Sequence, residues 1–393
     1  MATVENGRHA EETNPDAIRH VLFTESKEGR IIDACERKDI DELGDLAIAP
    51  GGFLSDHLRS RAWPILLGSD AVTTSDDPTE TSGSWRHLPR HRDEEQVKLD
   101  VDRSFVYYPN YKTQTQLEKK KSELSDLITQ VLREQPYLCY FQGYHDICQV
   151  LLLALPASLL ALAMSRLSVL RIRDFMLPTL APAVSQLHLI PDLLRAVDPG
   201  LWRHLSRNEP FFALADTLTM FAHNVQRYSD IARLFDALLA REQVFCLYVF
   251  TRIVLRRRAE LLAHEEPDML HFALSKLPPD LDLDAVIAEA AALFDEHPPE
   301  SLRAWRRISA ASVLKTTRDV KALTRQSLRD GQVFFEKQVR ELRWDERRQK
   351  MMNMAWANRT LLFTILVGIS AIYLRKTPVW AGLAAWVTRL GGR

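Results

Sequence analysis

The sequence predicts an all-α protein. Glycine is scarce, at 14 of 393 residues, so the many tight turns of a β-sandwich or barrel have few places to form. Apolar residues recur along most of the chain at intervals of three to five, which is the spacing of one helix face. Hydrophobic residues make up 46% of the chain, enough to bury a core. The length predicts two or three domains, or one large domain with extensions.

The charge balance and the motifs that are missing argue against several function classes. There are 51 Lys and Arg against 52 Asp and Glu, so we expect no general nucleic-acid binding. The patterns GxxxxGK[ST], GxGxxG, HExxH and GxSxG are absent from the sequence, so we expect no nucleotide or metal cofactor of its own. The four cysteines form no CxxC pair and are expected to be buried thiols in a reducing compartment.

The N-terminal part predicts short helices. Residues 1–16 are polar and predict disorder, and they contain no apolar signal-peptide core, which favours a cytosolic location for most of the chain. Apolar spacing predicts two short helices within 25–47. After the Pro50-Gly51-Gly52 break, Ser55 is expected to start another helix and Gly68 to end it.

A segment rich in Ser, Thr and acidic residues follows at 69–84, and it predicts a flexible surface loop within 69–90. The apolar run 150–164 is shorter than a membrane span and is split by Pro156, so we interpret it as a pair of core helices. The remaining spacing predicts further helices at 93–103, 114–133, 146–155, 209–223, 229–257 and 285–313.

The C-terminal part differs in character. Residues 318–350 carry ten Lys and Arg against six Asp and Glu, so 316–354 is expected to be a basic amphipathic helix or stalk near an anionic lipid surface. Residues 355–374 are about 30 Å long as a helix, and no charged residue occurs from 360 to 374, which predicts a transmembrane tail anchor. A short second apolar stretch lies within 375–393. A hydrophobic helix packed on the domain is the alternative to the anchor.

Three motifs occur in order: RSRAW at 59–63, VKLDVDR at 97–103 and YFQ at 140–142. They resemble the RxxxW, IxxDxxR and YxQ signatures of the TBC domain, the GTPase-activating domain for Rab proteins. Residues 218–223 and 233–236 look like the C-terminal lobe pattern of the same family, so the resemblance covers roughly 50–260. It implies a two-lobed helical domain, expected over 17–315, whose partner is a GTP-bound Rab that carries the GTP and Mg²⁺.

The resemblance implies that Arg103 and Gln142 are catalytic residues supplied in trans. An inserted arginine stabilises charge on the phosphoryl oxygens in the transition state, with effects of about 10³–10⁵ in rate. A glutamine amide can both donate to and accept from the attacking water. A helix at 93–103 would turn Asp100 inward and leave Arg103 free to project at its end. We expect Arg59 to be the charge partner of Asp100, with Trp63 packing one turn on.

The third motif predicts a loop fixed by the start of a helix. Gly143 allows a sharp turn directly after Gln142. Asp146 is expected to cap the following helix, with Gln149 as its capping-box mate, and Tyr140 is expected to pack below the loop. His145 has only Cys148 as a nearby candidate ligand, so we interpret it as a helix-start or interface residue rather than a metal ligand.

One departure from the family pattern narrows the resemblance. The family often has Met-Asn or Met-Ser after Gln-Gly, where this chain has Tyr144-His145. Together with the C-terminal anchor, this is similar to the branch anchored in the endoplasmic reticulum (ER), which acts on Rabs of the ER–Golgi pathway. Two alternatives remain open at this point: a catalytically silent Rab effector or membrane scaffold on the same fold, and a multipass membrane protein.

Overall fold

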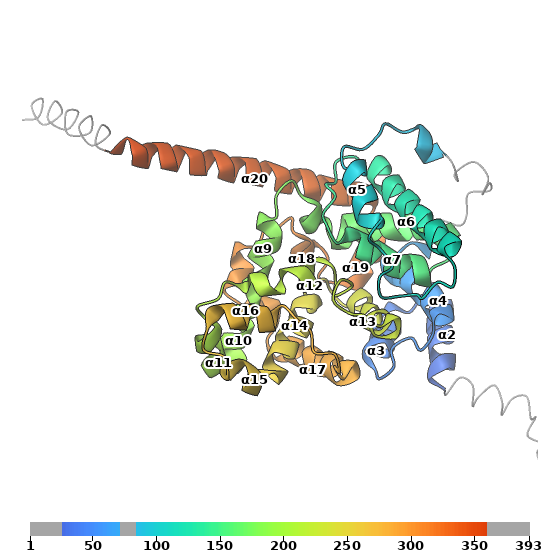
Figure 1. Ribbon diagram of the computed structural model, residues 1–393, viewed down its shortest axis with the longest axis horizontal. Helices are drawn as coiled ribbons and strands as arrows, with labels where there is room; N and C mark the ends of the chain where they lie inside the picture. The colour runs from blue at the N-terminus through green and yellow to red at the C-terminus, as the bar shows by residue number, and fades with distance from the viewer. Residues whose placement is uncertain (1–25, 71–83, 360–393) are drawn as a thin grey trace, which may run out of the picture. The chain divides into compact units, whose positions relative to one another are not determined.

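The computed structural model describes residues 26–70 and 84–359 (Figure 1). Every regular element in these two ranges is a helix, and neither contains a strand, which confirms the all-α prediction. The chain divides into two compact units, residues 1–336 and 337–393, and the candidate site lies entirely in the first. The predicted disorder at 1–16 and residues 71–83 of the predicted loop lie outside the described residues.

The N-terminal half forms one lobe. Its helices are α2 (Lys27–Arg37), α3 (Ile40–Ile48), α4 (Asp56–Leu67), η2 (Ser84–His87), α5 (Glu94–Val101), α6 (Gln114–Glu134), α7 (Tyr144–Ala154) and α8 (Ala157–Arg166). As predicted, the Ser55 side chain caps α4 by accepting a hydrogen bond from the Leu58 amide, and Gly68 ends this helix with φ +67°.

The predicted pair of core helices at 150–164 is confirmed. Pro156 directly precedes α8, and the inward residues of α7 and α8, such as Leu151 and Met164, are fully buried. Within the predicted loop 69–90, residues Ser84–His87 form the helix η2, whose Trp85 is buried. The Arg86 and Arg133 guanidinium groups lie 4.4 and 5.6 Å from the centre of its ring.

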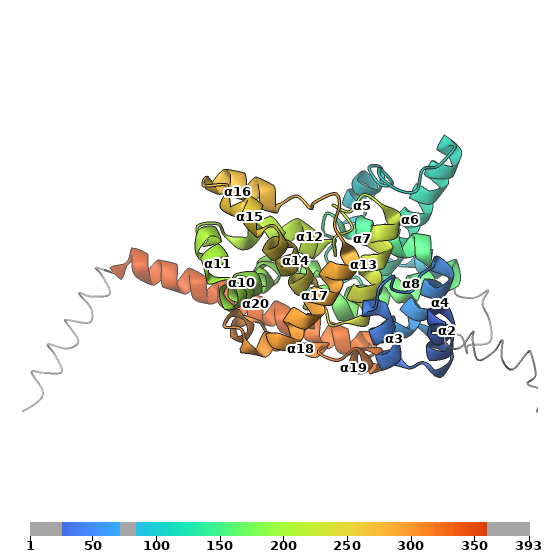
Figure 2. The ribbon, with the colours of Figure 1, turned by 90° about the horizontal axis from the view of Figure 1, so that it is seen from below.

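The C-terminal half forms a second lobe from shorter helices. They are α9 (Ala181–Leu187), α10 (Leu189–Val197), α11 (Pro199–Leu205), α12 (Leu214–Leu218), α13 (Tyr228–Ala240), α14 (Phe245–Arg256), α15 (Arg258–Leu262), α16 (Pro267–Leu274) and α17 (Leu283–Glu296). Figures 1 and 2 show α2–α8 gathered on one side and α9–α11 with α14–α16 on the other. Helix α13 lies between them and contacts α3, α4, α7 and α17.

Three long predicted helices are wrong because each is interrupted. The segment 229–257 breaks between α13 and α14, where the buried Arg171 binds the carbonyl groups at the end of α13. The segment 285–313 ends its helix at Glu296, because Pro298 and Pro299 lack the amide hydrogens that a helix needs. The segment 209–223 consists of the 3₁₀ turn η5 (Pro210–Ala213), α12 and an irregular turn.

The compact unit continues beyond residue 315, where the sequence places the end of the domain. Helices α18 (Val313–Thr316) and α19 (Val320–Arg325) follow, and α19 contacts α4. The start of α20 (Leu328–Ala357) also packs in this unit: Phe335 is 4% exposed, and its ring centre lies 4.9 Å from that of Tyr137. The predicted basic segment 316–354 therefore contains two helices, α19 and most of α20, rather than one.

The predicted membrane anchor falls largely beyond the described chain. From residue 360 onward the anchor 355–374, and all of 375–393, lie outside the described residues. Within 26–70 and 84–359, no helix combines the length and the apolar character that crossing a membrane requires.

Candidate functional site

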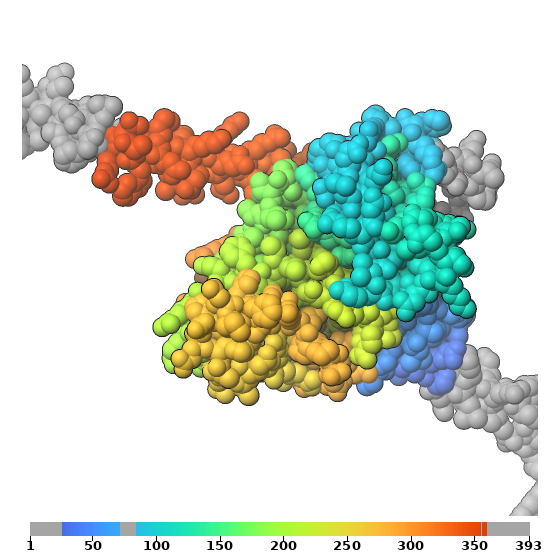
Figure 3. All heavy atoms as spheres, viewed as in Figure 1, coloured from blue at the N-terminus to red at the C-terminus, as the bar shows by residue number. Residues whose placement is uncertain are grey.

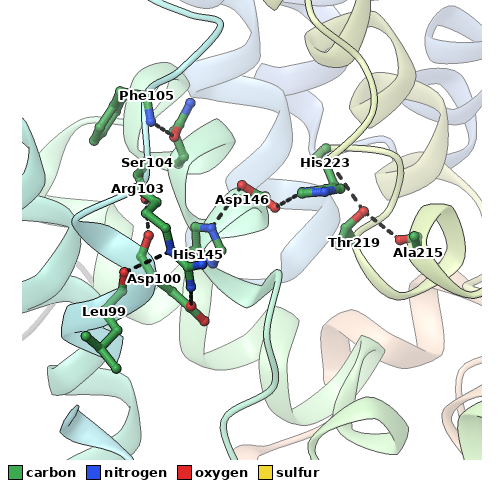
Figure 4. Close-up of polar contacts among 12 residues, drawn as sticks. Leu99, Asp100, Arg103, Ser104, Phe105, His145, Asp146, Ala215, Thr219 and His223 are labelled. Atoms are coloured by element: carbon green, nitrogen blue, oxygen red, sulfur yellow. Dashed lines mark hydrogen bonds and ion pairs between the residues drawn. The ribbon is translucent and has the colours of Figure 1, made fainter. Parts of the chain in front are cut away.

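Arg103 follows the end of α5 and projects into solvent. Val97, Asp100 and Val101 are all buried, which confirms the predicted inward face of this helix. The Arg103 side chain is 65% exposed. Its Nη2 donates to Asp100 Oδ1 at 2.6 Å and its Nε to the Leu99 carbonyl at 3.3 Å (Figure 4). The exposed guanidinium is thus held at the helix end by one ion pair with a buried carboxylate and by one backbone hydrogen bond.

The predicted pair between Arg59 and Asp100 is wrong. Asp100 is fully buried and accepts from Gln96 and from the Tyr140 hydroxyl, both at 3.0 Å, besides Arg103. Arg59 instead donates to Asp236 of α13 through Nε and Nη2, at 3.0 and 3.1 Å. Because Asp236 is completely buried, its carboxylate requires nearby donors, and packing of α13 on α4 places it beside Arg59.

Trp63 also serves this interface between α4 and α13. Its Nε1 donates to Asp236 Oδ1 at 2.9 Å, and the backbone amide of Phe53 donates to Oδ2 at 3.0 Å. With Arg59, three residues therefore supply four hydrogen bonds to one buried carboxylate. Asp236 belongs to the 233–236 pattern seen in the sequence, but the sequence alone did not indicate its partners.

Gln142 lies on the turn before α7. The residue is exposed, and among the described residues its side-chain amide has no hydrogen-bond partner. Gly143 has φ +101°, and a Cβ there would meet the Thr219 methyl group at 2.6 Å. Its conformation requires glycine, as the predicted sharp turn implied, and the close approach of Thr219 requires it as well. The turn thus presents a free amide on a constrained backbone.

The predicted capping role of Asp146 is wrong. Helix α7 begins at Tyr144, two residues earlier than expected, and Gly143 precedes it without a side-chain cap. Asp146 is thus inside the first turn, where Oδ2 lies 3.0 Å from His223 Nδ1 and Oδ1 lies 3.3 Å from His145 Nε2. Gln149 binds elsewhere: Oε1 accepts from the Phe105 amide and Nε2 donates to the Tyr108 carbonyl, both at 3.0 Å. It therefore fixes the chain that follows Arg103.

Tyr140 connects the two motifs. Its hydroxyl donates to Asp100 Oδ2 and lies 3.2 Å from His145 Nδ1. Burial and the neighbouring Asp100 carboxylate raise the pKa of Tyr140 far above its usual range, so the hydroxyl keeps its proton. These contacts join Tyr140 to Asp100 and His145, and its support of the loop stays a prediction. His145 is buried at the helix start, and no cluster of metal ligands occurs within the described ranges.

Arg103 and Gln142 line one groove, with a cavity of about 620 Å³. Its far wall comes from η5, α12 and the turn after α12, including Phe211, Thr219 and His223. Phe211 and Tyr107 are about half exposed at this groove. Figure 3 shows the teal atoms of the N-terminal half and the yellow-green atoms of the C-terminal half meeting on this face. Neither Phe211 nor His223 stood out as a site residue in the sequence.

The site also contains carboxylate and imidazole groups with altered acidity. Burial lowers the pKa of His145. The hydrogen bond between His223 and Asp146 raises the pKa of His223. Burial raises the pKa of Asp216, on α12 below His223, to about 7. His223 therefore carries positive charge to higher pH than His145 does. Arg103 and His223 are the cationic groups on opposite walls of the groove.

Comparisons with known proteins agree with this architecture. The family model of the Rab-GTPase-TBC domain matches residues 56–262. The chain is 33% identical to the GTPase-activating protein gyp10 of Schizosaccharomyces pombe over 311 residues, covering 77% of this chain and 81% of that protein. It is 30% identical to TBC1 domain family member 20 of Homo sapiens over 355 residues, covering 87% of each.

Two solved structures share the fold at lower sequence identity. The RabGAP TBC domain of the Chlamydomonas flagellum superimposes with a TM-score of 0.55 at 13% identity, covering 72% of this chain and 96% of that one. The Ypt/Rab-GAP domain of Gyp1p gives 0.53 at 15% identity, covering 69% and 99%. From the matched domain, the two relatives and the shared fold, we conclude that this chain belongs to the Rab-GTPase-TBC domain family.

Proposed function

We propose that this protein stimulates GTP hydrolysis by a Rab GTPase, and that Arg103 and Gln142 complete the active site of the partner in trans. The observation that carries the proposal is their common placement. Both are exposed on the wall of one groove, and both project from backbone that buried neighbours hold. The GTP and Mg²⁺ belong to the partner, and the protein needs no cofactor of its own.

Arg103 has the properties required of an inserted arginine. A guanidinium stays charged at all relevant pH values and offers five N–H donors to phosphoryl oxygens. The arginine side of its ion pair with Asp100 is 65% exposed to solvent, so a partner protein can reach the guanidinium directly. Asp100 keeps the Gln96 and Tyr140 hydrogen bonds when Arg103 moves away. The side chain can therefore reorient without unfolding the helix end.

Gln142 is suited to a different task. Its unpaired amide can accept from the attacking water and donate to an oxygen of the nucleotide. The Gly143 turn against Thr219 limits how far the backbone can move, which lowers the entropy cost of positioning that water. Glutamine is thus the positioning group, and arginine supplies the charge.

We further propose that residues 355–374 anchor the protein in the membrane of the ER or the early secretory pathway, with the helical domain in the cytosol and a Rab of the ER–Golgi pathway as substrate. The uncharged segment 360–374 supports this, as does the excess of basic residues in 318–350. Carbonate extraction of cell membranes tests the anchor: the full-length protein should stay in the pellet, and release into the supernatant would contradict it.

Single-turnover hydrolysis with a panel of GTP-loaded Rabs tests the catalytic proposal. The full-length protein in detergent should accelerate at least one Rab. Arg103→Ala should lower this acceleration by about 10³-fold or more, and Gln142→Ala should also lower it strongly. Arg90→Ala is the matched control, since its side chain is 64% exposed and also pairs with carboxylates.

The outcomes separate the alternatives. Binding of GTP-loaded Rabs without any acceleration would identify a silent effector instead. Full acceleration by Arg103→Ala would refute the assignment of the arginine while leaving the activity itself intact.

A further inference from the structure

A turn of the C-terminal lobe contacts the glutamine turn and carries a histidine with no assigned role. We propose that His223, in its protonated form, is a positioning residue that holds the Gln142 turn through Asp146. This inference rests on the proposed function of Gln142. It adds a residue from the second lobe to a site whose two proposed catalytic residues both come from the first.

The turn at 219–224 is rigid enough to act as a support. Met220 and Phe221 are completely buried, and both adopt positive φ angles, +50° and +66°. Non-glycine residues keep such angles only where the surroundings enforce them. Thr219 Oγ1 donates to the Ala215 carbonyl at 2.8 Å and accepts from the His223 amide at 3.3 Å. Asn224 Nδ2 donates to the buried Asp216 at 2.9 Å.

This turn contacts the Gln142 segment at two points, and Figure 4 shows the one between His223 and Asp146. The Thr219 side chain lies directly over Gly143, where a Cβ would come within 2.6 Å. His223 Nδ1 donates to Asp146 Oδ2 at 3.0 Å. The two contacts lie on either side of His145, so the first turn of α7 is fixed against the second lobe. Gln142 immediately precedes the first of these contacts, which limits the directions in which its amide can point.

Asp146 also connects the turn to the arginine. Its Oδ1 lies 3.3 Å from His145 Nε2, His145 Nδ1 lies 3.2 Å from the Tyr140 hydroxyl, and that hydroxyl binds Asp100, the ion-pair partner of Arg103. Polar contacts thus run without a gap from His223 to Arg103. Within the described residues, the ion pairs of Asp146 are made by His223 and His145 alone.

The charge on His223 is the variable in this arrangement. Asp146 and His145 of α7 and Asp216 of α12 face it, while Arg103 and Asp100 of α5 face His145. The Asp146 contact raises the pKa of His223 above its usual 6.5, and its side chain is 59% exposed, so it exchanges protons with water. A raised folded-state pKa means that the pair is present below about 6.5 and is lost as pH rises through the raised value.

Two variants and a matched control test the inference in the full-length protein. His223→Ala removes the contact. His223→Gln keeps an amide donor that can reach Asp146 but cannot titrate. His57→Ala is the control, because His57 is an exposed histidine on α4 away from the groove.

Hydrogen–deuterium exchange of the free protein at pH 6.5 gives a readout that needs no Rab. The Tyr144 and Asp146 amides donate to the Phe141 and Gly143 carbonyls. In His223→Ala, peptides that contain them should exchange several-fold faster, and in His223→Gln and His57→Ala they should match wild type. Unchanged exchange in His223→Ala would overturn the inference.

Stimulated hydrolysis between pH 6 and 8.5 gives the second readout, with a Rab that the wild type accelerates. His223→Ala should lower kcat about tenfold with little change in KM, because misplacing a catalytic group affects the transition state. The ratio of wild type to His223→Gln should fall as pH rises through the His223 pKa. A constant ratio would overturn the role of the proton. If the wild type accelerates no Rab, the proposed function fails, and the exchange experiment still decides whether His223 holds the turn.

Discussion

Two arginines of this domain show how surroundings decide what one side chain does. Arg103 stands at the groove, 65% exposed, with a single carboxylate partner. Arg171, in the π-helical segment after α8, is completely buried and has no ion pair among the described residues. It donates instead to the carbonyl groups of Leu238, Leu239 and Arg241. An exposed guanidinium is available to a partner protein, whereas the buried one binds backbone carbonyl groups of its own fold through Nη1 and Nη2.

The position of the buried Arg171 at the end of α13 has a clear electrostatic reason. The last carbonyl groups of a helix lack amide partners and carry partial negative charge, so a cation placed there is stabilised. Burial lowers the pKa of Arg171 to about 10, which still leaves it charged at neutral pH. Arg166 does the same for two helices, binding the Leu67 carbonyl at the end of α4 and those of Leu323 and Thr324 in α19. These arginines add donors at helix ends, and at α4 this comes in addition to the Gly68 cap.

Substitutions at buried charged groups should lower the free energy of unfolding more than substitutions at exposed ones. The largest effect is expected at Asp236. Asp236→Ala leaves Arg59 buried without its main partner and Trp63 without an acceptor, so we expect a loss of about 3–5 kcal/mol. Denaturant unfolding followed by circular dichroism measures it. Asp56→Ala is the control, because Asp56 is the exposed partner of Arg59 and should cost less than about 1 kcal/mol. Equal losses would show that burial does not decide the effect.

An intermediate effect is expected at Arg171. Arg171→Met keeps much of the side-chain volume but leaves the carbonyl groups at the end of α13 without donors, which should cost about 3 kcal/mol. Arg195→Met is its control, since Arg195 is exposed and lies over the Trp202 ring. Both variants are measured by the same unfolding curves, and an unchanged midpoint for Arg171→Met would refute the capping role.

The smallest effect is expected at the groove. Arg103→Ala removes one of three donors from the buried Asp100, which keeps its hydrogen bonds from Gln96 and Tyr140, so it should lower the free energy of unfolding by about 1–2 kcal/mol, more than Arg90→Ala. Its expected loss of catalytic stimulation is therefore not a consequence of unfolding. A loss of stability as large as that of Arg171→Met would mean that Arg103, like Arg171, has a structural role.

The sequence predicted features that depend on neighbouring residues. Ser55 and Gly68 bound their helix as expected, and Asp100 turns inward because residues 97, 100 and 101 share one face. Prediction from the sequence failed where the partner of a side chain lies far away along the chain. Arg59 binds Asp236, 177 residues away, and Asp146 binds His223, 77 residues away. Periodicity and caps report on a single turn of helix, whereas these pairs exist only once two lobes have packed.

The same dependence on distant residues explains why some helix boundaries were predicted wrongly. The segment 229–257 has a continuous apolar pattern, yet it is broken after Ala240, where the buried Arg171 takes the free carbonyl groups. The residues near 240 give no indication that an arginine seventy residues earlier in the chain binds there. The start of α7 was misplaced because Asp146 resembles a cap, although Gly143 had already begun the helix with its positive φ.

Because Arg166 binds carbonyl groups of both α4 and α19, its hydrogen bonds can be completed only after α19 has been synthesised. Its carbonyl partners lie on both sides of it, at residue 67 and at residues 323, 324 and 326. In a nascent chain that has emerged only through α17, Nε of Arg166 could bind the Leu67 carbonyl, but Nη1 and Nη2 would lack their carbonyl partners. The residues after 315 are therefore needed to complete the domain, and a fragment that ends at 315 would lack the carbonyl groups that bind Arg166.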